Sequence, residues 1–180
     1  MEHGRYTAEV GCKLYTRYNG KKYHIYYDHG KGETRTQNTC KPTPYFGDFK
    51  DYSKETTLSN VDIVVLDEKK DKVLLLVEIE ESGNNPKKVL GDIGAILISD
   101  GLMILDNKKR EFHSYCSKVK YILGIKTRTE AQNKKITGIC NRINPMQDKL
   151  ELIPICKCTS LPELETDVYA RIVSILDDFK

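Results

Sequence analysis

The chain of 180 residues carries 31% charged and 39% hydrophobic side chains, so it is too polar for an integral membrane protein and too apolar for a disordered one. No apolar run approaches the roughly 18 residues that span a bilayer, and the first ten residues lack the apolar stretch of a signal peptide. We therefore expect one soluble, cytoplasmic domain over residues 1–180 that has no contact with a membrane.

The N-terminal part, residues 1–57, is rich in Tyr and Lys and holds eight of the eleven tyrosines. A helix is predicted around Thr7–Tyr15 and a strand over Lys21–Tyr27, followed by an irregular loop that contains Gly and Pro. Aromatic side chains interleaved with basic ones can stack on nucleobases and hold phosphates. Alternating tyrosines on a half-exposed strand are the second interpretation, and the sequence leaves both open.

Residues 58–105 give the clearest pattern. Two runs of aliphatic residues, Val61–Asp67 and Lys72–Glu80, are separated by four polar residues and predict a β-hairpin. A helix follows, with Asn85 as the N-cap, Pro86 in the first helical position and Gly101 just past the end.

Residues 106–180 contain a basic segment and a C-terminal strand and helix. After a short strand at residues 102–105, which closes the preceding segment, strands are predicted at residues 119–125 and 149–155 and helices at residues 130–143 and 162–179. Hairpins mixed with helices favour an α/β fold in which a mixed β-sheet is flanked by helices.

The net charge of +3 is concentrated in residues 111–150, which hold eight basic and three acidic side chains. This block is the best candidate for a surface that faces a polyanion, although an ordinary solvated face explains it equally well. The side chains that we expect to bind nucleic acid are Lys118, Lys120, Lys126, Arg128, Lys134 and Lys135.

Six cysteines are scattered along the chain without a secretory signal, so we expect free thiols rather than a disulfide framework. Cys156 and Cys158 could hold zinc, but the sequence has no second C-x-x-C pair, and this is the weaker interpretation.

Three carboxylates follow the most apolar run of the chain, in the sequence VEIEES at residues 77–82. Residues two apart in a strand share a face, so Glu78 and Glu80 point the same way and Glu81 points away. If the hairpin folds about Lys70, residues whose numbers sum to 140 lie opposite one another, which places Asp62 beside Glu78.

The same register sets Leu66 opposite Leu74 and makes one face of the hairpin wholly apolar. The residues of that face are Ile63, Val65, Val73, Leu75, Val77 and Ile79. A shift of one residue would send Asp62 to the opposite face, and the sequence leaves this alternative open.

Like charges that converge at a partly buried strand end must be offset by protons, by bases or by a cation. Carboxylate oxygens at this spacing suit a hard divalent ion, so we expect Mg²⁺ (or Mn²⁺) bound by Asp62, Glu78 and Glu80. The alternative is that the strands simply end in water, where carboxylates need no partner.

The segment Leu58–Ser99 resembles the PD-(D/E)XK nuclease superfamily, which has the restriction endonuclease-like fold. The family signature is an Asp at the start of one core strand, an acidic-x-Lys tripeptide near the end of the next strand, and then a helix. The sequences SNVDIVVL, LLLVEIEES and NNPKKVLGDIGAIL follow in that order and cover about 40 of the 180 residues.

The resemblance implies a divalent-metal-dependent endonuclease that hydrolyses the phosphodiester bonds of double-stranded DNA, often as a homodimer. It makes Asp62 and Glu78 the metal-binding carboxylates and puts Glu80 where the family has its lysine. A minority of restriction endonucleases have E-x-E here, so Glu80 would act as general base or as a further metal ligand.

Other members of the superfamily take their lysine from the following helix, which makes Lys87 and Lys88 catalytic candidates. The alternative function is a catalytically inactive module of the same fold that binds nucleic acid or a protein partner, with Glu80 marking the lost lysine.

Overall fold

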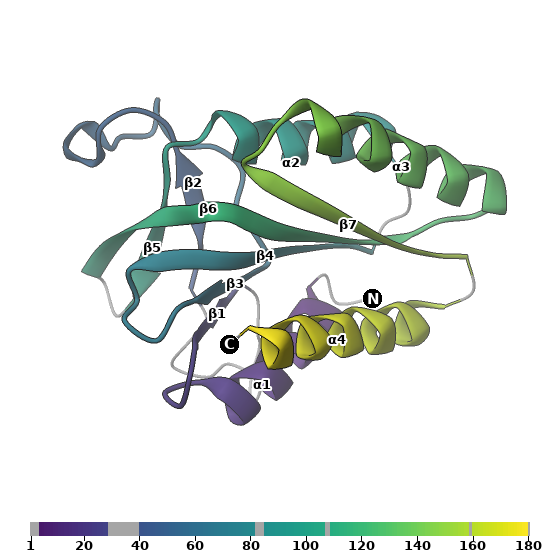
Figure 1. Cartoon of the computed structure of the whole chain (residues 1–180), viewed down its shortest axis with the longest axis horizontal. Coiled ribbons are helices and arrows are strands. Elements are labelled where there is room, and N and C mark those ends of the chain that lie inside the picture. Colours follow the sequence, from purple (N-terminus) through teal and green to yellow (C-terminus); the bar gives the residue numbers. More distant parts are fainter. Residues whose placement is uncertain (1–3, 29–39, 82–84, 107–108, 159, 180) are drawn as a thin grey trace.

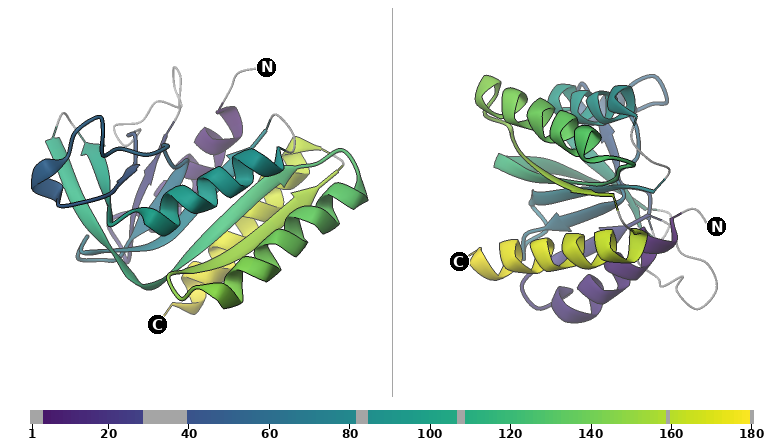
Figure 2. Two further views of the ribbon diagram at one scale, coloured as in Figure 1. Left: turned by 90° about the horizontal axis from the view of Figure 1, so that it is seen from above. Right: turned by 90° about the vertical axis from the view of Figure 1, so that its right-hand side faces the viewer.

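The computed structural model describes residues 4–28, 40–81, 85–106, 109–158 and 160–179. A curved mixed β-sheet lies between two pairs of helices (Figure 1). On one face are α1 (Arg5–Tyr18) and α4 (Leu161–Asp178), and on the other α2 (Pro86–Ile98) and α3 (Glu130–Ile143), as the two views of Figure 2 also show. The predicted α/β architecture, with a mixed sheet flanked by helices, is confirmed.

The described residues form a seven-stranded sheet in the order β1-β3-β4-β6-β5-β2, with β7 also paired to β6. Short 3₁₀ helices, η2 and η3, cover Phe49–Asp51 and Asn144–Met146. The strands are β1 (His24–Tyr27), β2 (Thr43–Tyr45), β3 (Ile63–Leu66), β4 (Lys72–Glu80), β5 (Gly101–Asp106), β6 (Lys109–Lys126) and β7 (Leu150–Lys157).

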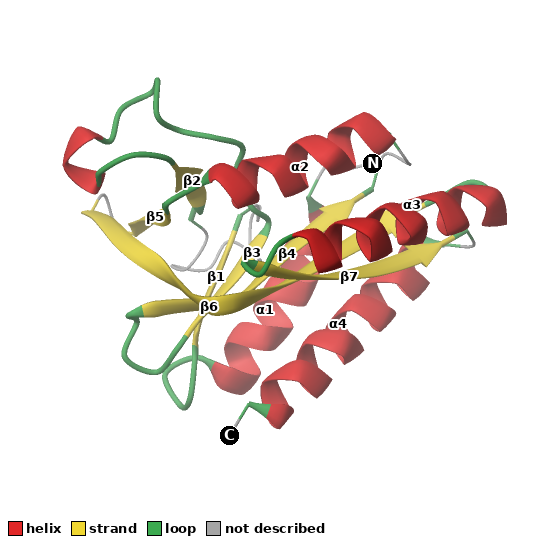
Figure 3. Ribbon diagram, turned by 45° about the horizontal axis from the view of Figure 1, so that its top comes forward, coloured by secondary structure: helices red, strands yellow, loops and turns green. Residues whose placement is uncertain are grey.

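Parallel and antiparallel pairing occur in different parts of the sheet. β3 runs antiparallel to its two neighbours, β1 and β4, whereas β4, β6 and β7 run parallel, with α2 and α3 as the crossovers. The carboxyl ends of β4, β6 and β7 therefore lie at one edge of the sheet. The first part of β6 pairs instead with β5, which pairs with β2 (Figure 3).

Each face of the sheet packs against its helices through a buried hydrophobic cluster. Val64 and Leu76 pack with Ile93 of α2, on the same face as α3. Ile63 and Val77 point the other way and pack with residues of α1 and α4. This alternation follows from the two-residue period of a strand, and it explains why the hairpin sequence is apolar on both faces.

The predicted hairpin register is correct in one half of the hairpin and wrong in the other. Val64 lies opposite Leu76 as expected, but Leu66 pairs with Val73 instead of Leu74, because the pairing shifts between Val65 and Leu66. Such a bulge puts an extra residue in one strand and reverses the alternation beyond it. Val73 consequently belongs to the cluster beneath α2 and α3, and its predicted place on the opposite face is wrong.

The helices begin and end close to the predicted residues. Glu130–Ile143 is found as predicted, and Asn85 caps α2 by accepting a hydrogen bond from the backbone N–H of Lys87 at 3.0 Å. The predicted role of Gly101 is wrong, because α2 ends at Ile98, Ser99 is its C-cap and Gly101 begins β5.

The tyrosines of β1 are buried. Tyr26 and Tyr27 are 4% and 0% exposed and lie in the hydrophobic clusters on opposite faces of the sheet, while Tyr23 is 3% exposed. These three side chains are therefore core residues, neither half-exposed nor presented to nucleobases.

All six cysteines are free thiols. Within the described ranges, no helix is both long enough and apolar enough to cross a bilayer.

Candidate functional site

Asp62, Glu78 and Glu80 all lie at the edge of the sheet where β4 ends. Asp62 directly precedes β3, and the pairing of Ile63 with Val77 puts it next to Glu78. The Oδ2 atom of Asp62 accepts a hydrogen bond from the backbone N–H of Ile79 at 2.7 Å, which ties the start of β3 to the end of β4. The hairpin thus brings together two of the predicted carboxylates from separate strands.

Glu78 has a strongly perturbed carboxyl group. Burial raises the pKa of Glu78 well above its ordinary value of 4.5, and the negative charges of Asp62 and Asp92 raise it further. The Lys88 ammonium and a backbone hydrogen bond from Asp62 act in the opposite direction without cancelling the rise. A raised pKa means that the surroundings disfavour the ionised form, which is the condition that a bound cation relieves.

Glu80 is 5% exposed and forms an ion pair with Lys88, which lies in the first turn of α2. Burial lowers the pKa of Lys88, but the hydrogen bond and the charge of Glu80 outweigh this effect and raise it overall. Lys87 is exposed at the neighbouring position of the same turn. Of the two lysines that the sequence could not separate, the structure therefore brings Lys88 to the carboxylates.

Two further residues belong to this cluster although the sequence did not single them out. Asp92 lies one turn after Lys88 on α2, and burial followed by the charge of Glu80 raises its pKa, while Lys88 opposes the rise. Tyr121 of β6 is 1% exposed, and burial together with the charges of Glu78, Asp92 and Asp62 raises its pKa well above 10. The four-residue spacing from Lys88 was a usable signal for Asp92, because such residues share one side of a helix.

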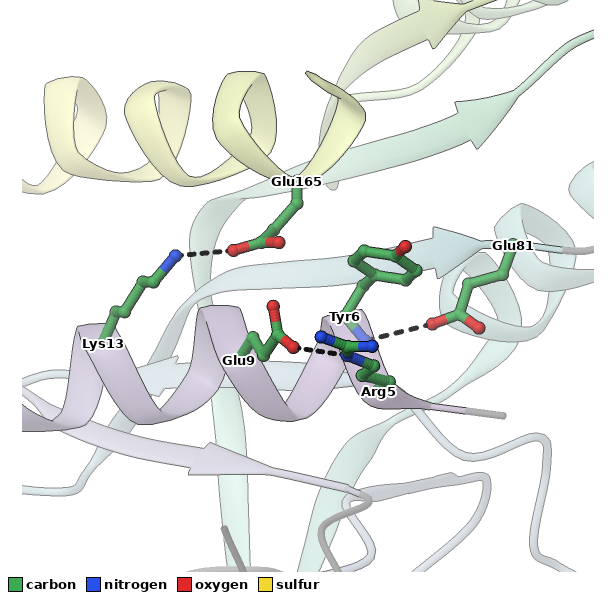
Figure 4. A network of polar contacts seen from close by, with 6 residues as sticks. All are labelled: Arg5, Tyr6, Glu9, Lys13, Glu81 and Glu165. Atoms are coloured by element: carbon green, nitrogen blue, oxygen red, sulfur yellow. Dashed lines mark hydrogen bonds and ion pairs between the residues drawn. The ribbon is translucent and has the colours of Figure 1, made fainter. Parts of the chain in front are cut away.

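Glu81 lies apart from this cluster, as predicted from the alternation of side chains along a strand. Its carboxylate accepts a hydrogen bond from the backbone N–H of Tyr6 at 3.3 Å, in the first turn of α1 (Figure 4). An anion is favourable there because the first N–H groups of a helix have no partner within the helix. Figure 4 also shows Lys13 of α1 paired with Glu165 of α4 at 2.6 Å, a contact that joins these two helices.

The predicted metal site can be tested against the donor atoms that the structure provides. Carboxylate oxygens of Asp62 and Glu78 have the chemistry that a hard divalent ion prefers. In the part of the chain that the structure describes, however, no group of three or more His, Cys, Asp or Glu side chains could hold a metal ion. Asp62 and Glu78 are thus the pair that fits best, and Glu80 is already neutralised by Lys88.

The same finding applies to the cysteines near the end of β7. The Sγ atom of Cys158 accepts a hydrogen bond from Asn133 Nδ2 at 3.1 Å, and Cys156 is partly buried. Their described surroundings contain hydroxyl and amide groups and a carboxylate, Glu130, but no metal-binding group of three.

The six basic residues expected to bind nucleic acid fall into two groups. Lys126 and Arg128 lie where β6 ends, at the same edge as Glu80, because Glu80 pairs with Ile125. Lys134 and Lys135 are exposed on α3, which starts at that edge.

Lys118 and Lys120 lie near the middle of β6. Lys120 pairs with Leu75, five residues before Glu80 and so roughly 17 Å along the strand. Lys120 also forms an ion pair with Glu151 of β7 at 2.8 Å. The first group therefore belongs to elements that end or start at the edge that carries the carboxylates, and the second group does not.

Comparison of the chain with protein-family models, with curated proteins and with solved structures gives no match.

Proposed function

We propose that the chain is a divalent-metal-dependent deoxyribonuclease with a restriction endonuclease-like core, which hydrolyses phosphodiester bonds of double-stranded DNA. The observation that carries this proposal is that Asp62, Glu78 and Lys88 meet at the end of β4, with the pKa of Glu78 raised by burial and by Asp62. Further support comes from the order of the segments, since the Asp, the hairpin, the acidic strand end and the helix follow the family signature.

Hydrolysis of a phosphodiester needs a positioned water and stabilisation of negative charge on the phosphoryl oxygens. Mg²⁺ (or Mn²⁺), held by Asp62 and Glu78, would supply a water of lowered pKa and neutralise part of that charge. Lys88 donates hydrogen bonds to the developing negative charge, and Glu80 holds Lys88 in place. In this proposal Glu80 is a positioning residue, and a lysine of α2 replaces the lysine that the family has in the strand.

The test is cleavage of supercoiled and linear duplex DNA, with a duplex RNA of the same sequence in parallel. We expect cleavage of DNA with Mg²⁺ or Mn²⁺ and none with EDTA. Replacing Lys88 by Ala should lower the rate by about 10²- to 10³-fold, the loss typical of one donor to a transition-state oxyanion. Glu78→Ala should lower it at least as much, because it removes a metal ligand.

Lys87→Ala is the matched control, because it removes an exposed lysine from the same helical turn. Its rate should stay within about twofold of wild type, as is usual for surface substitutions away from the chemistry. A Glu78→Ala protein that cleaves DNA at the wild-type rate contradicts the proposal.

An inactive nuclease-fold module is the second candidate, and one observation favours it. The ion pair of Glu80 with Lys88 neutralises part of the cluster without a metal, and the described residues offer no metal-binding group of three. This candidate predicts DNA binding in EDTA and no cleavage with either ion.

Cutting both strands would also call for two active sites, so sedimentation of the protein with a short duplex should show a homodimer only if the nuclease proposal holds.

A further inference from the structure

A cleft of about 360 Å³ lies beside β2 and differs in its charge from the acidic end of β4. Three cationic side chains line it, Lys41, Lys54 and Arg110, together with hydroxyl groups that include those of Thr43 and Thr57. No Asp or Glu is among the described residues of its lining. A cleft with three cations and no carboxylate favours an anionic ligand.

The position of Arg110 is fixed by a neighbouring aromatic side chain. The guanidinium carbon of Arg110 lies 5.2 Å from the centre of the Tyr52 ring, which in turn packs edge-on against Tyr45 and Phe112. Stacking on an aromatic ring holds a guanidinium in place while leaving its N–H donors available.

The backbone at the two lysines is held by threonine hydroxyls. Thr43 Oγ1 donates to the carbonyl oxygen of Lys41 at 3.0 Å, and Thr57 Oγ1 donates to that of Lys54 at 2.9 Å. The ammonium groups themselves are on exposed side chains. The cleft therefore combines a backbone held by hydrogen bonds with charged groups on exposed side chains, which suits a ligand of repeated phosphates better than one small rigid molecule.

The cleft is connected to the carboxylate cluster by a short piece of chain. Asn60 lines the cleft, and Asp62 follows two residues later, at most about 7 Å away along the backbone. The backbone N–H of Val61, between them, donates to the carbonyl oxygen of Pro42, the residue after Lys41. A strand of nucleic acid in the cleft would therefore pass close to Asp62.

We propose that this cleft binds backbone phosphates of DNA and guides the strand to Asp62 and Glu78. Arg and Lys donors match phosphate oxygens in geometry and charge, and backbone phosphates supply most of the affinity of proteins for DNA. The choice of DNA as the source of phosphate rests on the proposed nuclease function, whereas the phosphate chemistry follows from the lining itself. The cleft adds Lys41, Lys54 and Arg110 to the residues that contact substrate.

The test measures binding without cleavage. Fluorescence anisotropy of a labelled duplex in EDTA, repeated over a range of salt concentrations, gives the affinity and its salt dependence. Removing one cation that neutralises a phosphate should reduce the slope of log affinity against log salt by about 0.9, so the triple variant Lys41→Ala/Lys54→Ala/Arg110→Ala should show a much shallower slope. Arg110→Lys should keep most of that slope, because it retains the charge.

A second triple variant, Lys21→Ala/Lys69→Ala/Arg171→Ala, is the matched control. It removes the same number of lysines and arginines from exposed positions outside the cleft. Its slope and affinity should remain those of the wild type, and circular dichroism melting checks that both triple variants fold. Equal slopes for wild type and the cleft variant overturn the inference.

The outcomes separate this inference from the proposed function. If the wild type cleaves DNA and the cleft variant binds and cleaves it equally well, the role of the cleft is rejected and the nuclease function is retained. If the wild type binds DNA through the cleft but never cleaves it, the nuclease function is rejected and the role of the cleft is retained. If inorganic phosphate at constant ionic strength stabilises the wild type and not the cleft variant, while DNA binding is the same in both, the ligand is free phosphate and the assignment to DNA is overturned.

Discussion

Glu78 is the residue on which the pH response of the acidic cluster depends. Its pKa in the folded chain lies above 4.5, so between that value and the folded pKa the native state binds more protons than the unfolded state. Stability then falls as the pH rises through this window. A cation at the cluster would counteract the fall by favouring the ionised carboxylate.

Glu78→Gln should remove this dependence, because glutamine has no charge to lose or gain. Relative to wild type, we expect the variant to be more stable at pH 7 and to lose that advantage as the pH falls well below 4.5, where the wild-type carboxyl is protonated in both states. Urea denaturation at a series of pH values measures the difference. Mn²⁺ at pH 7 should stabilise the wild type and leave the variant unchanged.

Glu68→Gln at the exposed tip of the hairpin serves as the control for this change. It also converts one glutamate to glutamine, but outside the cluster, and its stability should follow that of the wild type at every pH. If the stability of the Glu78→Gln protein depends on pH as that of the wild type does, ionisation of Glu78 is not the cause of the dependence.

Among the helices, α1 depends on a single glycine for its distance from the sheet. A Cβ atom added at Gly11 would lie only 2.3 Å from Cγ of Tyr27, which is fully buried in β1. Tyr27 cannot move without disturbing the cluster beneath α1 and α4. The helix therefore approaches β1 more closely than any residue with a side chain would allow at this position.

Gly11→Ala should destabilise the chain. Alanine favours the helix over glycine by about 1 kcal/mol, but overpacking a well-packed core costs typically 1–3 kcal/mol, and the contact with Tyr27 is too short to relax easily. We expect a net loss of about 1–2 kcal/mol in urea denaturation. Gly138→Ala in α3, where nothing lies within 4 Å of the added Cβ, should instead gain up to about 1 kcal/mol, and equal effects at the two sites would contradict this packing argument.

Elements with a strong apolar period were predictable from the sequence. α3 and β4 have their predicted bounds, because caps, turn residues and apolar spacing agree there. β2 has only three residues and contains Pro44, and the first ten residues of β6 are too polar to alternate, so both were missed.

The candidate site, like the fold, was predictable only where a local pattern in the sequence determines the structure. Strand parity separates Glu78 and Glu80 from Glu81, but whether Lys87 or Lys88 reaches Glu80 depends on how α2 is rotated on the sheet. That rotation is set by tertiary packing, which no local pattern records.

At the scale of the whole molecule, β6 holds the sheet together. Its C-terminal part pairs with β4 on one side and β7 on the other, and its first part pairs with β5. Ile122 and Leu123 in that C-terminal part face opposite hydrophobic clusters, so helices cover both sides of the strand. This segment can be exposed only when both layers separate.

Hydrogen exchange should therefore be slowest in residues 119–126. Their amides should exchange only through global unfolding, whereas those of β2, a three-residue strand at the end of the sheet, should exchange through local opening. Exchange followed by mass spectrometry at peptide resolution measures both. Equal protection of the two segments would mean that the sheet does not open from the β2 end.

The parallel pairing of β4 with β6 has a consequence for synthesis on the ribosome. The hairpin of β3 and β4 is complete once residue 80 has emerged. The strand that pairs with the other side of β4 is β6, which is complete only when Lys126 has emerged. During the interval β4, with its apolar run over residues 73–77, offers unpaired backbone groups to any other nascent chain. Truncated products that stop before β6 should accordingly aggregate, and holdase chaperones should bind the chain at this stage of its translation.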